Sequence, residues 1–358
     1  MAVHFHPLIV EEVSKETADC VSIHFEIPAA LKSIFEYHPG QNITLKTAVK
    51  GKVIRRSYSI CTAPFENKLS IAVKKINMGL FSTHANEHLR KGDTIEVLPP
   101  TGRFFTPLLP GNKKNYLAFA AGSGITPVIS IIKATLQTEP GSCFTLVYGN
   151  RTRGSIIFFE ELEAIKNRYM ERFCLINILS REKTEAPVNT GRIDNEKLYE
   201  LTKLINYKNM DDTFICGPEK MLFCVKDFLE QNGIGKEKIH FELFTVPGQK
   251  TTAPGIMHPA GDTGKKSKIT IKLDGRTTGF ELELNGASIL DAALHQGCDL
   301  PFACKGGVCG TCRAKLLEGK VSMDANFALE KEEMEKGYIL TCQSHPITES
   351  VSIDFDSR

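Results

Sequence analysis

The sequence predicts a multidomain protein: an antiparallel β-barrel, an α/β domain with a parallel sheet, and a smaller α+β domain. Three observations support this. The 358 residues exceed what one hydrophobic core usually holds. Short β-rich runs give way after about residue 110 to strands that alternate with helices. Residues 247–266 contain three prolines, four glycines and no aromatic residue, which indicates a linker. We therefore expect domains at residues 1–110, 111–246 and 267–358.

The first domain carries the pattern of a small antiparallel barrel. Turn signals such as Pro39-Gly40 and Gly92-Asp93 separate runs rich in β-branched residues. Strands this short and this closely spaced favour a barrel. We expect strands at Val21–Ile27, Asn42–Val49, Val53–Ile60, Leu69–Val73 and Thr94–Leu98, and a short helix at Phe81–Arg90.

The second domain alternates buried strands with helices, which is typical of βαβ units and a parallel sheet covered on both faces. The strands are expected at Tyr116–Ala121, Phe144–Tyr148, Phe173–Leu179 and Thr213–Cys216, and a helix at Glu219–Gln231 follows the last of them. Beyond residue 267 the sequence returns to strands around one helix, Ser288–Gln296.

Composition excludes several classes of protein. The chain is 42% hydrophobic and 24% charged, as soluble globular proteins are, and its net charge of +2 argues against a nucleic-acid partner. No apolar run of 18 residues predicts a membrane span, and the first residues lack a signal-peptide pattern. Eleven cysteines without a disulfide framework predict a cytoplasmic location.

Four cysteines near the end of the chain carry the most specific signal. Cys304, Cys309 and Cys312 read C-x4-C-x2-C, and Cys342 follows after 29 further residues. This is the plant-type spacing of a [2Fe–2S] cluster, in which one loop supplies three thiolates and a later segment the fourth. The alternatives are ordinary buried thiols or a zinc site, which usually takes two short cysteine pairs where this chain has one. Except for Cys216, we expect the remaining cysteines to lie in cores.

A glycine-containing turn follows the first strand of the parallel sheet. The string is Gly122-Ser123-Gly124-Ile125-Thr126-Pro127. Glycines let the backbone approach a phosphate, and the N-terminus of the following helix favours its charge. Pro127 suits the first helical turn, but it stands where the dinucleotide fingerprint has a third glycine. A plain structural turn is the alternative.

Basic residues end the next two strands. Arg151 and Arg153 follow the second strand, and Ser180 and Arg181 end the third. An acidic residue near here would suit the ribose of NAD, whereas a basic one suits the 2′-phosphate of NADP. Arginine also binds phosphate in a bidentate manner. The alternative is that these arginines are solvated surface residues.

Three further strings have a possible chemical role. One string, Arg56-Ser57-Tyr58-Ser59, ends a barrel strand. The arginine could bind a pyrophosphate, the tyrosine could cover a flat ring, and a serine could form a hydrogen bond to a ring nitrogen. Gly79 and Ser82 open the short helix, as a phosphate site or as an ordinary helix start. Cys216, Gly217 and Pro218 lie at the carboxyl edge of the parallel sheet, where ligands bind, although a buried thiol explains the cysteine equally well.

Taken in order along one chain, these motifs resemble the ferredoxin–NADP reductase superfamily followed by a plant-type ferredoxin. The order is similar to that of reductase components of multicomponent bacterial oxygenases. The strings TLQTEP and GRID, which carry no chemistry, together with RSYSIC, AAGSGITP and the cysteine loop, resemble the reductase components of phenylacetyl-CoA epoxidases.

The resemblance implies an FAD domain in the barrel, an NADP domain in the parallel sheet and a ferredoxin domain of β-grasp fold. It implies that FAD is held by Arg56, Ser57, Tyr58, Ser59, Gly79, Phe81 and Ser82, with Glu242 and Phe244 near the flavin ring. It implies that NADPH is held by Gly122, Ser123, Gly124, Thr126, Pro127, Arg151, Ser180, Arg181, Cys216, Gly217 and Pro218. Ser59, Cys216 and Glu242 are the implied catalytic residues, and Cys304, Cys309, Cys312 and Cys342 the cluster ligands.

The implied function is electron transfer from NADPH through FAD and the cluster to a di-iron oxygenase, the core of phenylacetyl-CoA epoxidase, with no nucleic-acid or membrane partner. The same redox chain serving another oxygenase, a desaturase or a haem protein is the nearest alternative. A redox sensor that holds both groups without turnover is an alternative of a different class.

Overall fold

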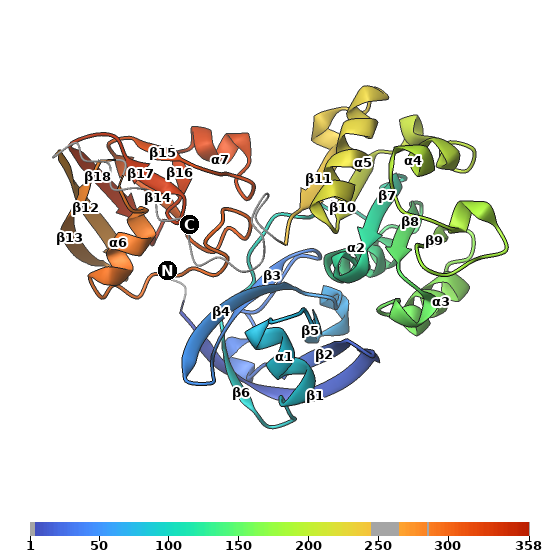
Figure 1. Ribbon diagram of the computed structural model, residues 1–358, viewed down its shortest axis with the longest axis horizontal. Coiled ribbons are helices and arrows are strands. Elements are labelled where there is room, and N and C mark those ends of the chain that lie inside the picture. The colour runs from blue at the N-terminus through green and yellow to red at the C-terminus, as the bar shows by residue number, and fades with distance from the viewer. Residues whose placement is uncertain (1–3, 245–264, 285, 358) are drawn as a thin grey trace. The chain divides into compact units, whose positions relative to one another are not determined.

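The computed structural model describes residues 4–244, 265–284 and 286–357. The chain forms two compact units, one built on residues 7–243 apart from a short piece of one strand, and one built mainly on the residues from 244 onward. Figure 1 shows the elements of both. All but the last two residues of the predicted linker lie outside the described residues, and the last, Lys266, already begins a strand. The three domain boundaries stay predictions.

The N-terminal half of the first unit is an antiparallel barrel. Its elements are β1 (His6–Thr17), β2 (Cys20–Glu26), β3 (Asn42–Val49), β4 (Lys52–Ser59), β5 (Leu69–Lys74), α1 (Leu80–Glu87) and β6 (Thr94–Val97). The strand order is β4-β3-β6-β1-β2-β5, and a bridge between Ile60 and Ile71 joins the end of β4 to β5 and closes the barrel. Strand β1 was not expected from the sequence.

The second half of this unit is a parallel sheet in the order β11-β10-β7-β8-β9. Its elements are β7 (Asn115–Ala121), α2 (Ile125–Thr138), β8 (Cys143–Asn150), α3 (Phe159–Arg168), β9 (Phe173–Leu179), α4 (Asn195–Leu201), β10 (Asp212–Cys216), α5 (Glu219–Gln231) and β11 (Ile239–Glu242). The chain moves outward from β7 to β9 and then returns to the other side of β7. Right-handed crossovers therefore place α2 and α3 on one face and α4 and α5 on the other (Figure 1).

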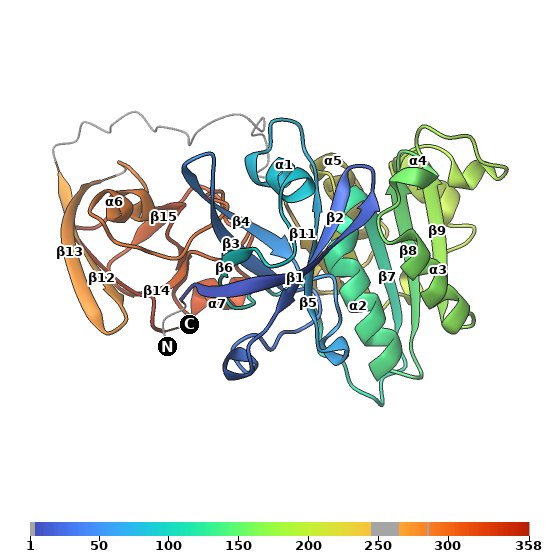
Figure 2. The same ribbon diagram turned by 90° about the horizontal axis from the view of Figure 1, so that it is seen from below.

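Helix α2 is buried on almost every side, with only two of its 14 residues outside the core. It shares one hydrophobic cluster with sheet strands and with barrel residues such as Cys61 and Phe104. Its Ser130 hydroxyl donates to the Thr62 carbonyl at 2.6 Å. Figure 2 shows α2 lying between the barrel and β7. Barrel and sheet therefore share one core, which sets the position of each relative to the other.

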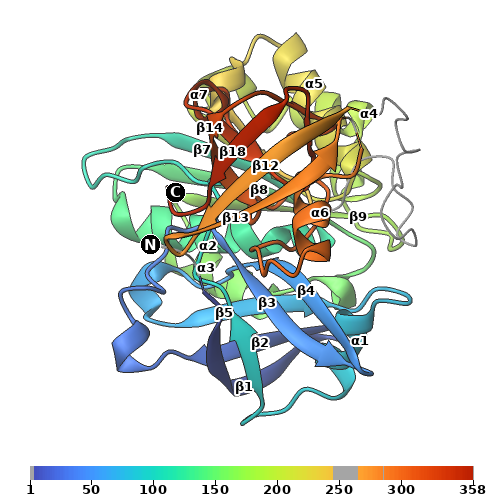
Figure 3. The same cartoon turned by 90° about the vertical axis from the view of Figure 1, so that its left-hand side faces the viewer.

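The second unit has its own core around a mixed sheet. Its elements are β12 (Lys266–Leu273), β13 (Arg276–Glu283), α6 (Ile289–His295), β14 (Arg313–Glu318), β15 (Val321–Met323), α7 (Lys331–Glu335), β16 (Tyr338–Leu340), β17 (Ser344–Pro346) and β18 (Ser350–Asp354). The order is β13-β12-β18-β14-β16, with β15 and β17 paired separately. Leu290 and Ala293 of α6 pack with Ile269 and Ile353 of the sheet. Figure 3 shows α6 beside the sheet strands β12 and β13. A sheet that holds one main helix is the predicted α+β fold.

Among the described helices, none has the length and apolar character needed to cross a membrane.

Candidate functional site

The glycine turn lies where the strand order of the parallel sheet reverses. Gly122–Gly124 form a single 3-10 turn between β7 and α2, and Gly122 has a φ of +54°. A Cβ atom on Gly124 would lie 2.1 Å from the Cys216 carbonyl oxygen and 2.8 Å from the Gly217 nitrogen. The ends of β7 and β10 thus meet at the switch point, which is where nucleotides bind to such sheets.

Two hydroxyls hold this turn in place. The Tyr148 hydroxyl, on β8, donates to the Gly122 carbonyl at 2.9 Å, and the Thr126 hydroxyl donates to the Ser123 carbonyl at 3.0 Å. Because these bonds engage carbonyl oxygens of the turn, a bound anion would meet its N–H groups. Thr126 was predicted here, whereas Tyr148 was missed.

The helices expected to meet phosphates differ from the others at their first turns. Among the seven described helices, α1 and α2 alone begin with neither a side-chain cap nor an acidic residue. Asp194 and Ser288 cap α4 and α6, and glutamates occupy the first turns of α3, α5 and α7. The N–H groups and the positive ends of α1 and α2 are therefore suited to phosphate. This fits the expected FAD and NADP sites.

The three predicted catalytic residues meet at one place. The Ser59 hydroxyl, at the end of β4, donates to Glu242 Oε2 at 3.0 Å. Glu242 on β11 is the parallel partner of Cys216 on β10. Burial, with the nearby Glu242 carboxylate, raises the pKa of the Cys216 thiol well above its usual value. Cys216 therefore stays protonated at neutral pH and presents a neutral thiol.

The predicted flavin residues surround the start of α1. The rings of Tyr58 and Phe81 lie 5.4 Å apart. Gly79 is the N-cap residue of α1, and a Cβ atom there would lie 2.3 Å from the Ser82 hydroxyl oxygen. The Ser82 hydroxyl also accepts a bond from the Ile76 N–H at 3.2 Å. These contacts make the turn before α1 compact, while the N-terminus of the helix has no side-chain cap.

Other predicted residues are less enclosed. Arg56 on β4 is exposed, and its guanidinium donates to the Arg55 carbonyl at 2.7 Å. Ser57 is half-buried, and Phe244 is 42% exposed at the end of the first described range. Pro127 and Gly217 lie beside the glycine turn, and Pro218 is the N-cap residue of α5.

The ends of β8 and β9 bring the predicted phosphate-binding arginines together. The backbone N–H of Arg181 donates to the Arg151 carbonyl at 2.8 Å, and that of Ser180 donates to the Asn150 carbonyl at 2.9 Å. Both arginine side chains are exposed. Within the described ranges neither guanidinium belongs to an ion pair, so both are available to a phosphate at the carboxyl edge of the sheet.

The four predicted cluster cysteines form two pairs. A hydrogen bond within the pair Cys304 and Cys309 raises the pKa of Cys304 and lowers that of Cys309. The same contact between Cys312 and Cys342 raises the pKa of Cys312 and lowers that of Cys342. With all four thiols deprotonated, each of the two pairs would hold one of the two irons of a [2Fe–2S] cluster.

The ligand loop turns tightly around this site. Lys305, Gly307 and Gly310 all have positive φ angles, of 53°, 74° and 66°. The Gly306 N–H donates to Cys304 Sγ at 3.3 Å. A Cβ atom on Gly307 would lie 2.8 Å from the Ala325 carbonyl oxygen, which explains the glycine.

The expectation that the remaining cysteines are core residues is partly wrong. Cys20 and Cys61 are buried, but Cys143 and Cys174 are exposed, and Cys224 and Cys298 are intermediate. Cys174 lies on the edge strand β9, where alternate residues face solvent.

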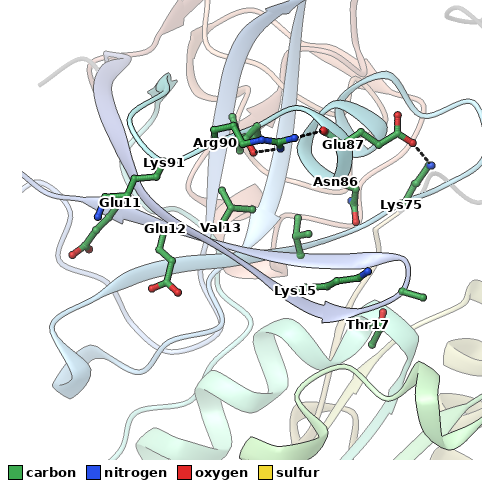
Figure 4. A pocket seen from close by; sticks show the side chains of 13 residues that line it. Glu11, Glu12, Val13, Lys15, Thr17, Lys75, Asn86, Glu87, Arg90 and Lys91 are labelled. Carbon is green, nitrogen blue, oxygen red and sulfur yellow. Dashed lines mark hydrogen bonds and ion pairs between the residues drawn. The ribbon is translucent and has the colours of Figure 1, made fainter.

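A pocket on the barrel contains no predicted site residue. It lies between β1 and α1 (Figure 4). Its lysine Lys75 pairs with Glu87, and its Arg90 donates to the carbonyls of Glu87 and Leu89. Lys75 and Arg90 are thus already engaged within the barrel, and none of the predicted flavin or nicotinamide residues lines this pocket.

Family models match each part of the chain. An oxidoreductase FAD-binding domain matches residues 7–106, an oxidoreductase NAD-binding domain residues 119–227, and a 2Fe-2S iron-sulfur cluster binding domain residues 271–346. Together with the site, these matches define an NAD(P)H-dependent oxidoreductase that binds FAD and a [2Fe–2S] cluster.

Whole-chain relatives narrow this class. The chain is 44% identical over 355 residues to a subunit of 1,2-phenylacetyl-CoA epoxidase from Escherichia coli, covering 99% of this chain and 98% of the relative. It is 34% identical to the ferredoxin reductase component of 3-ketosteroid-9-alpha-monooxygenase from Rhodococcus rhodochrous, covering 97% and 96%. It shares the fold of phthalate dioxygenase reductase, with a TM-score of 0.59, 24% identity and 98% of each chain covered. The chain belongs to the family of phenylacetyl-CoA epoxidase reductase components, in which a ferredoxin domain follows a ferredoxin–NADP reductase-type module.

The chain therefore transfers electrons from NAD(P)H through FAD to a [2Fe–2S] cluster. When bound, FAD accepts two electrons as a hydride and releases them singly, which a one-electron cluster needs.

Proposed function

We propose that this chain supplies electrons from NADPH to the di-iron oxygenase of a phenylacetyl-CoA epoxidase. The observation that carries the proposal is the 44% identity to a component of that enzyme over almost the full length of both chains. The sequence identity to the ketosteroid monooxygenase component is ten percentage points lower over a similar length.

We assign the flavin site to the end of β4 and the start of α1. Tyr58 offers a ring face to the flavin, and the uncapped N-terminus of α1 offers N–H groups to the pyrophosphate. The hydrogen bond between Ser59 and Glu242 orients both polar groups toward one place at the flavin ring. The neutral Cys216 thiol beside them contacts the nicotinamide without adding a charge.

We assign NADPH to the switch point, with its 2′-phosphate on Arg181 and Arg151. Both guanidiniums are exposed at the same sheet edge as the glycine turn, and their backbones are hydrogen-bonded to each other. Arginine forks bind phosphate oxygens through charge-assisted hydrogen bonds. NADPH is therefore expected to bind more tightly than NADH.

Reconstitution tests the acceptor. The purified chain, loaded with FAD and cluster, is mixed with NADPH, phenylacetyl-CoA and the oxygenase core of a phenylacetyl-CoA epoxidase, and NADPH oxidation coupled to product is measured. The oxygenase of a ketosteroid monooxygenase with its own substrate is the matched control. Coupled turnover with the first and little with the second supports the proposal. The reverse result assigns the chain to another oxygenase, for which the 34% relative is the precedent.

Fast NADPH oxidation with ferricyanide separates an electron-transfer enzyme from a redox sensor, because a sensor does not need turnover. A cytoplasmic location is also proposed. All eleven cysteines lie within the described residues and none forms a disulfide, which supports a reducing compartment.

A further inference from the structure

Gln343 directly follows the fourth cluster cysteine and reaches back to the ligand loop. Its side-chain nitrogen lies 3.0 Å from the Lys305 carbonyl oxygen and 2.9 Å from the Cys342 carbonyl oxygen. The same nitrogen lies 3.7 Å from Cys342 Sγ, within range of a bond to sulfur. One carboxamide therefore touches both the loop that carries three ligands and the residue that carries the fourth.

The chemistry of the neighbours sets the orientation of this carboxamide. Two carbonyl oxygens and a ligand sulfur are all acceptors, so the amide oxygen would be repelled from the position that the NH₂ group occupies. The two N–H groups then serve three acceptors. One N–H points to Lys305, and the other is shared between the carbonyl and the sulfur of Cys342.

The backbone around Gln343 is held firmly. The Asp324 N–H donates to the Gln343 carbonyl at 3.0 Å, and the Gln343 N–H donates to the Leu340 carbonyl at 2.9 Å. The carbonyl that receives the side chain belongs to Lys305, whose φ of +53° exposes it on the turn between Cys304 and Gly306. The contact with Cys342 Sγ is therefore a built feature of the site.

We propose that Gln343 raises the reduction potential of the [2Fe–2S] cluster by donating a hydrogen bond to the thiolate sulfur of Cys342. Reduction adds one electron to the cluster without making or breaking a bond, and FAD is the donor. A hydrogen bond to a ligand sulfur draws negative charge away from the irons and so favours the reduced state. The setting makes such a donor valuable, because residues 267–358 carry 14 acidic against 10 basic side chains, and this negative charge opposes reduction.

The test is the midpoint potential of the cluster in the full chain, followed by EPR in a redox titration. Gln343→Leu keeps the approximate size of the side chain and removes the donor. Gln296→Leu is the matched control, because Gln296 is an exposed glutamine at the end of α6 in the same unit. At the native midpoint, we expect the ratio of reduced to oxidised cluster to fall by roughly three- to tenfold in Gln343→Leu, the range for losing one ordinary hydrogen bond, because the bond to sulfur is long and shared with a carbonyl oxygen. Gln296→Leu should leave it unchanged.

An unchanged midpoint potential in iron-loaded Gln343→Leu overturns the proposal. Gln343 would then only link the backbone at Cys342 to the backbone at Lys305. Gln343→Glu is the second variant, since it keeps the shape, lacks the donor at neutral pH and should lower the midpoint further. If iron analysis shows that both variants lose the cluster, the native protein is labelled with ¹⁵N in its glutamine side chains and studied by pulsed EPR. A ¹⁵N coupling to the reduced cluster supports the bond, and its absence contradicts it.

Discussion

Replacing Gly124 by alanine tests whether the switch point needs the close approach of β7 and β10. The new Cβ atom would lie 2.1 Å from the Cys216 carbonyl oxygen, whereas such contacts essentially never fall below 3.0 Å. The turn and the end of β10 must therefore separate by about 0.9 Å. Because Gly124 has a φ of −61°, which alanine adopts readily, the whole cost is one of packing.

Overpacking of this kind costs about 1–3 kcal/mol, and a displacement near 1 Å at a reacting centre can slow catalysis about 10²-fold. We therefore expect Gly124→Ala to lower the melting temperature by about 2–10 °C. We also expect NADPH-driven bleaching of the flavin, measured by anaerobic stopped flow at saturating NADPH, to slow by about 10- to 100-fold.

Substitutions at two other glycines distinguish the cost of packing a new Cβ atom from the cost of backbone strain. Gly154 has open space around its Cβ position and no positive φ, so Gly154→Ala should change neither the melting temperature nor the rate of flavin bleaching. Gly122 also has open space but a φ of +54°, so Gly122→Ala should cost about 1–2 kcal/mol through strain alone. A Gly124→Ala enzyme that bleaches its flavin as fast as Gly154→Ala would show that the close approach does not position the nicotinamide.

Three further predictions follow, two from the site and one from the core. Cys309→Ser should lose cluster iron yet keep FAD and ferricyanide-linked NADPH oxidation, because each unit has its own core; retained cluster absorbance would contradict the ligand assignment. Arg181→Ala should raise the Kd of NADPH about tenfold or more and that of NADH little, and equal losses would remove Arg181 from the 2′-phosphate site. Burial raises the pKa of Cys61 in the folded state, so folding stability should fall as pH rises past the ordinary value of 9.0. Cys61→Ala should remove up to about 1.4 kcal/mol per pH unit of that slope in urea unfolding between pH 9 and 10.5, and an unchanged slope would contradict the shift.

Regular elements were predictable because their patterns are uninterrupted. Strands Asn42–Val49 and Phe173–Leu179 and helix Glu219–Gln231 have the predicted bounds. Strand β1 was missed because its pairing with β2 is irregular between Val10 and Glu12 and between Lys15 and Thr17, which breaks the alternation that identifies strands. Strand β11 has four residues, and only its pairing with β10 reveals it.

The site residues also fall into those that the sequence could predict and those that it could not. The cluster cysteines and the glycine turn lie close together in sequence, so their spacing alone predicted a chemistry. Glu242 meets Ser59 across 183 residues, and only a resemblance to known reductases placed it near the flavin. Tyr148 and Gln343 were missed because each acts on a backbone carbonyl, 26 and 38 residues away respectively, and such a bond leaves no spacing signature.

The burial of α2 on almost every side also limits how such a chain can be recombined. A fusion point between the barrel and the parallel sheet would uncover the isoleucines, valine and leucine of a helix that is buried on almost every side, and would expose an aggregation-prone surface. Residues 7–243 are thus a single cassette for gene fusion or for engineering. The second unit, which has its own core, is the part that can be exchanged when a new electron acceptor is wanted.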